Sequence, residues 1–199
     1  MKPLCFILWV IAFSLAACSS LHSPLPLTDV PSPAALSSTV FVGHAQAFRF
    51  AGGGWIPVPE YDYEFLMLER RYADRWEAIK EIHRRHPRYD GRAGPRDDTL
   101  YFSVRTSPGA DGGLDLVVEG TLGAGKGHEE PGGGGLVLEL ATAERGWFVP
   151  FDKIRIRQIR EVAKGRFKEI VDLFSRREGR EIPFMRMQEE GIIYRPAAP

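Results

Sequence analysis

The segment "TLYFSVRTSPGADGGLDLVVEGTL" (residues 99–122) decides the predicted fold class, because it holds two strand-like runs on either side of a turn. The runs at 99–106 and 114–122 are rich in β-branched and aromatic residues, which are typical of strands. Between them, "SPGADGG" (107–113) contains several glycines, which accept the positive φ angles of tight turns. Strands that follow one another through short turns favour an antiparallel sheet.

Other segments are predicted to extend this sheet. The runs at 38–50, 61–72 and 136–143 are strand-like in the same way. The glycine-rich stretch 123–135 is predicted to be a loop that joins two strands. Residues 182–196 are predicted to form a hairpin or two short edge strands.

Two further segments favour helices. In "DRWEAIKEIHRRHP" (74–87), Asp74 is a suitable N-cap, and Trp76, Ile79 and Ile82 repeat at helical spacing. In 153–176 the apolar residues also fall on one helical face, but the "AKGR" sequence leaves open a hairpin of two strands. The chain is therefore predicted to form a single α+β domain over 39–199. It would be mainly an antiparallel meandering sheet with one or two packed helices.

The amino-terminal segment predicts export. Lys2 is followed by fifteen residues without a charge, which is shorter than the ~20 apolar residues of a membrane-spanning helix. A basic start, a short apolar run and small residues before a cleavage site are typical of a secretory signal peptide, here residues 1–17. Residues 18–38 are rich in proline and serine and are predicted to be an extended tether.

The end of the signal resembles a known family. Leu15-Ala16-Ala17-Cys18 is similar to the lipobox of bacterial lipoproteins. The resemblance implies that the thiol of Cys18 receives a diacylglyceryl group, that the signal is cut before it, and that the new amino terminus is acylated, commonly by palmitate. Two or three acyl chains make a stable anchor. Ser19 in place of an aspartate implies the outer membrane, with the domain facing the periplasm. Cys5 lies within the signal, so Cys18 is the single cysteine of the mature chain.

Charge gives little indication of a partner. The chain has 26 basic and 26 acidic residues, so its overall charge favours neither nucleic acid nor an acidic partner. A basic ridge would exist if 153–176 were helical, and it could lie against anionic phospholipid. Its members would be Lys153, Arg157, Arg160, Lys164 and Lys168.

The densest polar stretch is "HRRHPRYDGRAGPRDD" (83–98). His83, His86 and Asp90 are weak candidates for metal ligands, but their spacing matches no metal motif, so neither a metal nor another cofactor is predicted. Its arginines could clamp a phosphate or a carboxylate of an anionic envelope component, because guanidinium binds such groups in a bidentate manner. These candidate ligand-binding residues are Arg84, Arg85, Arg88, Arg92 and Arg96. Alternatively, Arg88, Arg92 and Arg96 tie the connector to nearby carboxylates and backbone carbonyls.

No catalytic residue is predicted. Gly120–Gly127 has the spacing of a phosphate loop, but Gly127 stands where a serine or threonine would hold magnesium. No G-x-S-x-G sequence marks a nucleophilic serine. The sequence therefore favours a lipid-anchored envelope protein with a binding or structural role, acting through an envelope protein or an anionic component. The alternatives are a curved-sheet carrier or chaperone for an apolar ligand, and a metal-dependent periplasmic hydrolase.

Overall fold

The computed structural model describes residues 35–90, 96–142 and 151–194, and these residues form eleven strands in one antiparallel sheet. The strands are β1 Ser37–Ala51, β2 Gly54–Pro57, β3 Tyr63–Arg71, β4 Arg75–Arg84, β5 Asp97–Pro108, β6 Leu114–Gly120, β7 Gly123–Glu129, β8 Gly135–Ala141, β9 Lys153–Glu161, β10 Arg166–Arg177 and β11 Arg180–Tyr194. Four short 3-10 turns join some of them: η1 Pro59–Tyr61, η2 Pro87–Asp90, η3 Pro131–Gly133 and η4 Val162–Lys164.

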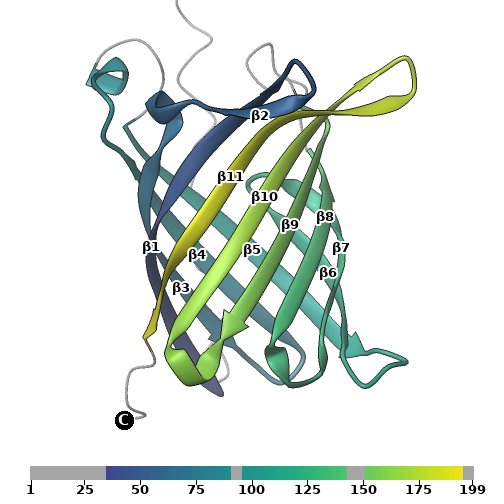
Figure 1. Ribbon diagram of the computed structural model, residues 1–199. Helices are drawn as coiled ribbons and strands as arrows, with labels where there is room; N and C mark the ends of the chain where they lie inside the picture. The colour runs from purple at the N-terminus through teal and green to yellow at the C-terminus, as the bar shows by residue number, and fades with distance from the viewer. Residues whose placement is uncertain (1–34, 91–95, 143–150, 195–199) are drawn as a thin grey trace, which may run out of the picture. The chain divides into compact units, whose positions relative to one another are not determined.

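The sheet closes on itself to form a barrel (Figure 1). From β3 to β11 each strand pairs with the next one in the chain. The first strand, β1, pairs with β3 on one side and with β11 on the other, so that Val40 lies opposite both Leu68 and Tyr194. The short strand β2 pairs only with the end of β1. Closure leaves no free edge in the wall of β1 and β3–β11.

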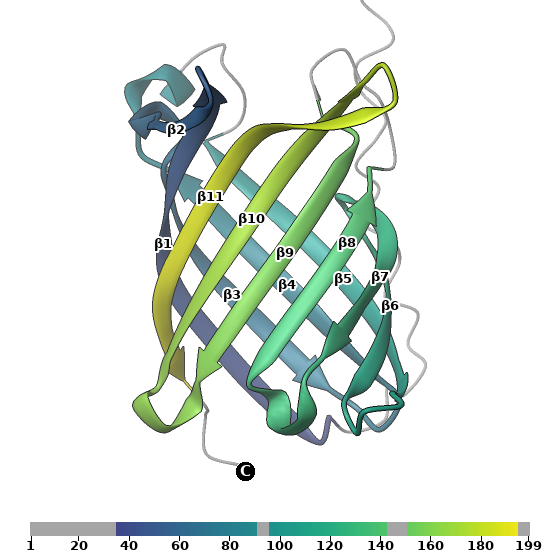
Figure 2. The ribbon, with the colours of Figure 1, turned by 45° about the vertical axis from the view of Figure 1, so that its right-hand side comes forward.

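The two ends of the barrel are distinguished by the chain segments that lie there. Ser37, at the start of β1, and Tyr194, at the end of β11, lie at one end, which we call the terminal end. The β10–β11 turn at Glu178–Gly179 lies at the other end, which we call the distal end (Figures 1 and 2).

Alternation along the strands separates a mostly apolar interior from an outer face that carries both charged and apolar side chains. In β8, Leu136, Leu138 and Leu140 are buried inside, whereas Val137 and Glu139 between them are outside. The other strands alternate in the same way, and the core includes Phe41, Phe65, Val104, Ile154 and Phe167. The core therefore fills the inside of the barrel rather than a layer between a sheet and helices.

The prediction of an α+β domain with packed helices is wrong. Residues 74–87, predicted as a helix, form β4, in which Trp76, Ala78, Lys80 and Ile82 alternate inward. Ile79 faces outward, so its helical spacing from Trp76 and Ile82 is accidental. An inward-facing lysine interrupted the apolar alternation by which a strand is recognised. Within the residues described, no helical segment reaches the length and apolarity needed to cross a membrane.

The second predicted helix, 153–176, is a hairpin, so the alternative interpretation is the correct one. Strands β9 and β10 are joined by η4 and by Gly165, whose φ of 61° suits a turn. The basic ridge predicted on that helix does not exist, because Arg160 points into the barrel while Arg157 and Lys168 lie on its outer face.

The predicted loop at 123–135 is also wrong in part, because residues 123–129 form β7. Glycines disfavour strands in general, but here they permit close approach of the neighbouring strand. A Cβ atom on Gly125 would lie 1.9 Å from the carbonyl oxygen of Glu139 on β8. Residues 182–194 belong to one long strand, β11, rather than to a hairpin. The strands predicted at 38–50, 61–72, 99–106, 114–122 and 136–143 are confirmed in their central parts.

Candidate functional site

A cavity of about 470 Å³ lies inside the barrel, toward its distal end. Most of its wall is apolar and comes from inward-facing positions, such as Ala78, Phe102, Leu138, Ile154 and Met185. Residues near the distal end of the barrel also line it, among them Tyr61, Arg84, Asp98 and Phe151. Its volume lies within the range of ~300–1,000 Å³ that small-molecule sites occupy.

Charged side chains also line this cavity, and the first cluster is built around Lys80. The ammonium of Lys80 donates to both carboxylate oxygens of Glu189, at 2.5 and 2.6 Å, and lies 3.6 Å from Glu169. The hydroxyl of Tyr63 donates to Glu189, and the amide of Gln158 donates to Glu169 at 2.6 Å. These side chains come from β3, β4, β9, β10 and β11, so the cluster joins strands from different parts of the wall.

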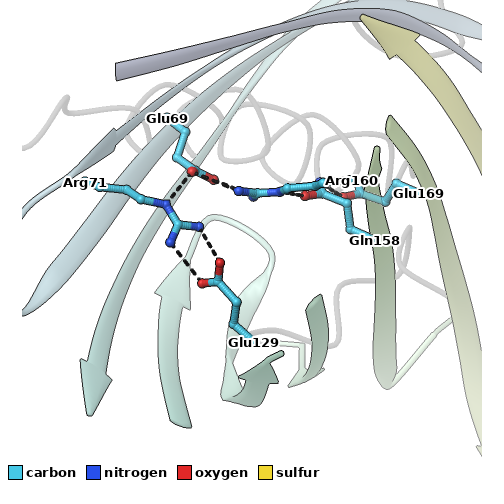
Figure 3. A network of polar contacts seen from close by, with 6 residues as sticks. All are labelled: Glu69, Arg71, Glu129, Gln158, Arg160 and Glu169. Atoms are coloured by element: carbon cyan, nitrogen blue, oxygen red, sulfur yellow. Dashed lines mark hydrogen bonds and ion pairs between the residues drawn. The ribbon is translucent and has the colours of Figure 1, made fainter. Parts of the chain in front are cut away.

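A second cluster continues from the first, and Figure 3 shows the connection. Arg160 donates to the side-chain oxygen of Gln158 and to Glu69, 2.8 Å away. Glu69 also accepts from Arg71 at 2.8 Å, and Arg71 reaches Glu129 at 3.0 Å. The two clusters together form one continuous inward-facing network, which we call the lumen network. Its members are Tyr63, Glu69, Arg71, Lys80, Glu129, Gln158, Arg160, Glu169 and Glu189.

Burial changes the pKa values of this network. Burial, reinforced by the nearby charge of Glu189, raises the pKa of Glu169 from 4.5 to about 7, although Lys80 and Gln158 lower it. Burial alone would lower the pKa of Lys80, but Glu189 and Glu169 outweigh that effect and raise it. Burial likewise opposes ionisation of Glu69, yet Arg160 and Arg71 hold the pKa of that carboxyl below its ordinary value. Burial and Glu189 raise the pKa of Tyr63 well above 10.

The second cluster also divides the interior. A smaller cavity of about 320 Å³ lies toward the terminal end, lined by Thr39, Arg71 and Glu129 among others. Glu69 and Arg160 line both cavities. The ion pair between them, whose side chains are 2% and 10% exposed, is therefore the partition between the distal and terminal compartments.

The predicted metal candidates do not converge. His83 is on the outer face of β4, where its Nδ1 lies 2.5 Å from a carboxylate oxygen of Asp97. The Nδ1 of His86 accepts the backbone N–H of Arg88 at 3.2 Å, and Asp90 is the last residue of η2. The described residues contain no group of three or more His, Cys, Asp or Glu side chains placed to hold a metal ion.

The arginines predicted to clamp an anionic group each contact a different part of the protein. Arg84 lines the distal cavity and lies 3.5 Å from Asp98, while Arg85 is outside the barrel with Glu64 at 2.6 Å. Arg88 lies over the ring of Tyr61 at 4.6 Å. Arg96 donates to the carbonyl oxygen of Arg84 at 2.9 Å, as the alternative interpretation of a tied connector expects. Arg92 and the predicted lipidation residue Cys18 lie outside the described residues.

Sequence reasoning missed the lumen network. One signal could have found it: a single charged residue at an inward position of an otherwise apolar alternation, as with Lys80 between Ala78 and Ile82. The same signal occurs in β10, where Glu169 follows Phe167. A related signal occurs in β9, where the polar but neutral Gln158 follows Ile154 and Ile156. Buried charges are rare unless they are paired, so such positions predict a polar site inside a core.

Comparison with known proteins adds no family to this description, because no protein-family model and no curated protein matches the chain. The structural class of this protein is therefore defined by its fold and its candidate site. The chain forms a closed antiparallel barrel that encloses an apolar cavity with a buried, ionisable polar wall.

Proposed function

We propose that this protein is a carrier or chaperone that binds a small, largely apolar molecule inside the barrel. The observation that carries the proposal is the cavity of about 470 Å³, which is lined mostly by apolar side chains and lies within a closed wall. A core without a ligand function would normally be filled to the density of an organic crystal, with few voids larger than a water molecule. A mostly apolar cavity with a few convergent polar groups is the usual form of a small-molecule site.

We also propose that the carrier is anchored to the cell envelope, at the periplasmic face of the outer membrane, through lipid on Cys18. The sequence of the lipobox supports this proposal. The tether predicted at 18–38 would join the barrel through Ser37, at the terminal end, whereas the larger cavity lies toward the distal end. A lipid anchor would thus leave that cavity on the side away from the attachment point.

Binding can be tested with the full chain that follows the signal, carrying Cys18→Ser so that it stays unlipidated. The neutral fluorescent probe N-phenylnaphthylamine should bind saturably, with a rise in emission as it leaves water. Ala78→Phe fills the cavity from β4 and should weaken binding about tenfold or more, which corresponds to a loss of ~1.4 kcal/mol. The matched control is Ala141→Phe, which places the same side chain on the outer face of β8.

Two results would count against the carrier function. The first is an absence of saturable probe binding to the folded wild-type protein. The second is equal binding by the Ala78→Phe and Ala141→Phe proteins, which would place the probe somewhere other than the cavity. Circular dichroism of each variant would establish that the barrel is intact. Mass spectrometry of the native protein purified from cells would then identify any molecule that remains bound.

A further inference from the structure

The lumen network holds one more acid than base, and this imbalance indicates which ligand the cavity accepts. Its carboxylates are Glu69, Glu129, Glu169 and Glu189, and its cations are Arg71, Lys80 and Arg160. Among the residues that the structure describes, the other charged pair that lines the distal cavity, Arg84 with Asp98, is balanced. A buried site with an unbalanced charge must acquire a proton or a counter-ion, because an isolated charge in a medium of low polarity is costly.

The cations of the network are already engaged. Lys80 directs two hydrogen bonds to Glu189, while Arg160 and Arg71 both bind Glu69. An anionic head group that entered the cavity would therefore have to compete with carboxylates that lie within 3 Å of these donors. It would also face Glu169, whose side chain lines the cavity. The charges of the wall disfavour an anion.

Glu169 is the acid left with the weakest compensation. Its Oε2 accepts from the neutral amide of Gln158, and its distance of 3.6 Å from Lys80 is longer than that from Lys80 to Glu189. The carboxyl is buried, lines the apolar cavity and belongs to β10, next to the inward-facing Val171 and Leu173. A cation that arrived here would find a carboxylate beside an apolar surface.

We propose that the cavity binds a lipophilic amine, with its ammonium group against the carboxylate of Glu169 and its hydrocarbon part against the apolar wall. This inference rests on the proposed carrier function and narrows it to one class of ligand. The ammonium would supply the positive charge that the lumen network lacks. A charge-assisted hydrogen bond in a buried site is stronger than one between neutral groups. The apolar part of the ligand would gain free energy from leaving water.

The inference makes binding dependent on pH, because the ammonium replaces the proton on Glu169. The groups that face this carboxyl are Lys80 on β4, Glu189 on β11, Tyr63 on β3 and, through Gln158, Arg160 on β9. Lys80 and Tyr63 have raised pKa values and keep their protons near neutrality. Glu169, with its pKa of about 7, is the member that changes charge in this range. Affinity for an amine should thus rise with pH.

The test is competition against bound N-phenylnaphthylamine by three ligands with the same chain: dodecylamine, dodecanol and dodecanoate, each below its micelle concentration. At pH 8 the amine should displace the probe at a concentration at least tenfold below that of the alcohol, and dodecanoate should be the weakest. Between pH 8 and pH 6 the amine should lose about tenfold in affinity, as expected for a group with a pKa near 7, while the alcohol should not change.

Two variants locate the effect. Glu169→Gln keeps an acceptor for Gln158 and should abolish both the preference for the amine and its pH dependence. Glu190→Gln removes a carboxylate from the exposed face of the adjacent strand and should leave both unchanged. The affinity of the wild-type protein for dodecylamine at pH 6 and pH 8 can be compared without any variant. This comparison therefore tests the inference even if Glu169→Gln fails to fold.

The outcomes separate the two proposals. If the alcohol or dodecanoate binds as tightly as the amine at pH 8, the assignment of a lipophilic amine is overturned while the carrier function stands. If neither the probe nor any of the three ligands binds, the carrier function itself fails. A preference for the amine that persists in the Glu169→Gln protein would place the ammonium elsewhere and would also overturn the inference.

Discussion

Lys80 on β4 and Glu189 on β11 form a doubly hydrogen-bonded ion pair inside the barrel, with side chains only 6% and 1% exposed. The two strands are not neighbours in the sheet, since β3 and β1 lie between them. The pair therefore links separate parts of the wall across the interior. It also connects the apolar cavity to the rest of the lumen network through Glu169.

Loss of Lys80 should destabilise the barrel strongly. Lys80→Met leaves Glu189 buried without its cation, and we expect the free energy of unfolding to fall by ~3–5 kcal/mol. The matched control is Lys168→Met, because Lys168 pairs with Glu190 on the outer face, where both side chains are more than half exposed. That change should cost less than ~1 kcal/mol. Urea denaturation followed by circular dichroism measures both.

A double variant tests whether the uncompensated charge of Glu189 causes this loss of stability. In the double variant Lys80→Met with Glu189→Gln, the uncompensated charge is removed, so part of the lost stability should return. If Lys80→Met lowers the free energy of unfolding no more than Lys168→Met does, the ion pair between Lys80 and Glu189 does not stabilise the barrel as proposed.

Stability should fall as the pH rises from about 4.5 to about 7. In this range the folded state keeps a proton on Glu169, whereas the unfolded chain, with the ordinary pKa of 4.5, releases it. The folded state thus binds more protons, and the free energy of unfolding decreases with pH, by an amount on the order of 3 kcal/mol over the range. Below about pH 4.5 Glu69 has the opposite effect, because its lowered pKa makes protonation unfavourable to the folded state.

Denaturation of the ligand-free protein at a series of pH values from 4 to 8 measures this profile. Glu169→Gln should flatten the decrease between pH 5 and pH 7. All other ionisable groups are the same in both proteins, so the difference between the two profiles isolates Glu169. If the stability of the wild-type and Glu169→Gln proteins changed with pH in the same way, Glu169 would not be the group that loses its proton in this range.

The glycine at position 125 should not tolerate a side chain. Gly125→Ala places a methyl group against the backbone of β8, 1.9 Å from the carbonyl oxygen of Glu139 and 2.7 Å from the Cα atom of Leu140. Backbone atoms cannot rotate away, so we expect a loss of stability of ~1–3 kcal/mol or more. Gly134→Ala is the control, because its Cβ would meet nothing within 4 Å and its φ is −76°. Thermal melting of the two proteins should differ clearly, and equal melting temperatures would refute the close approach.

Lipidation at Cys18 can be tested in cells. Cys18→Ser should release the protein from the membrane fraction into the soluble periplasmic fraction, because the lipobox thiol is the proposed attachment point of the lipid. Mass spectrometry of the wild-type protein should show the added acyl groups on the amino-terminal peptide. A Cys18→Ser protein that still fractionates with membranes would contradict the lipid anchor.

The sequence predicted strands wherever the inward-facing residues are all apolar. The segment around Phe102 and Val104 and the segment around Leu116 and Val118 were recognised in this way. The prediction failed in two segments that place polar or charged side chains inside, although 61–72 was predicted correctly as a strand despite the inward-facing Glu69 and Arg71. Lys80 made β4 resemble an amphipathic helix, and Gln158 and Glu169 had the same effect on β9 and β10.

The candidate site could not be predicted because its residues come together only in the closed barrel. Glu69 and Lys80 lie on the consecutive strands β3 and β4, whereas Glu169 and Glu189 lie on β10 and β11, far along the chain, and closure of the barrel brings the two pairs of strands together. No local spacing encodes that proximity. The arginines that stood out in the sequence are close to one another in the chain, but of the four that the structure describes Arg84 alone lines the distal cavity.

The pairing of β1 with β11 also constrains when the cavity can exist. Val40 and Tyr194, which face each other in this pairing, lie near opposite ends of the described chain, so this contact can form only after the strands between them have been synthesised. Contacts between distant residues form slowly because a long loop must first be closed. Until β11 has been synthesised, β1 has an open edge and the apolar lining is exposed to water. The proposed loading of a ligand therefore requires that β11 has been synthesised and paired with β1, and a chain truncated before β11 should aggregate rather than bind.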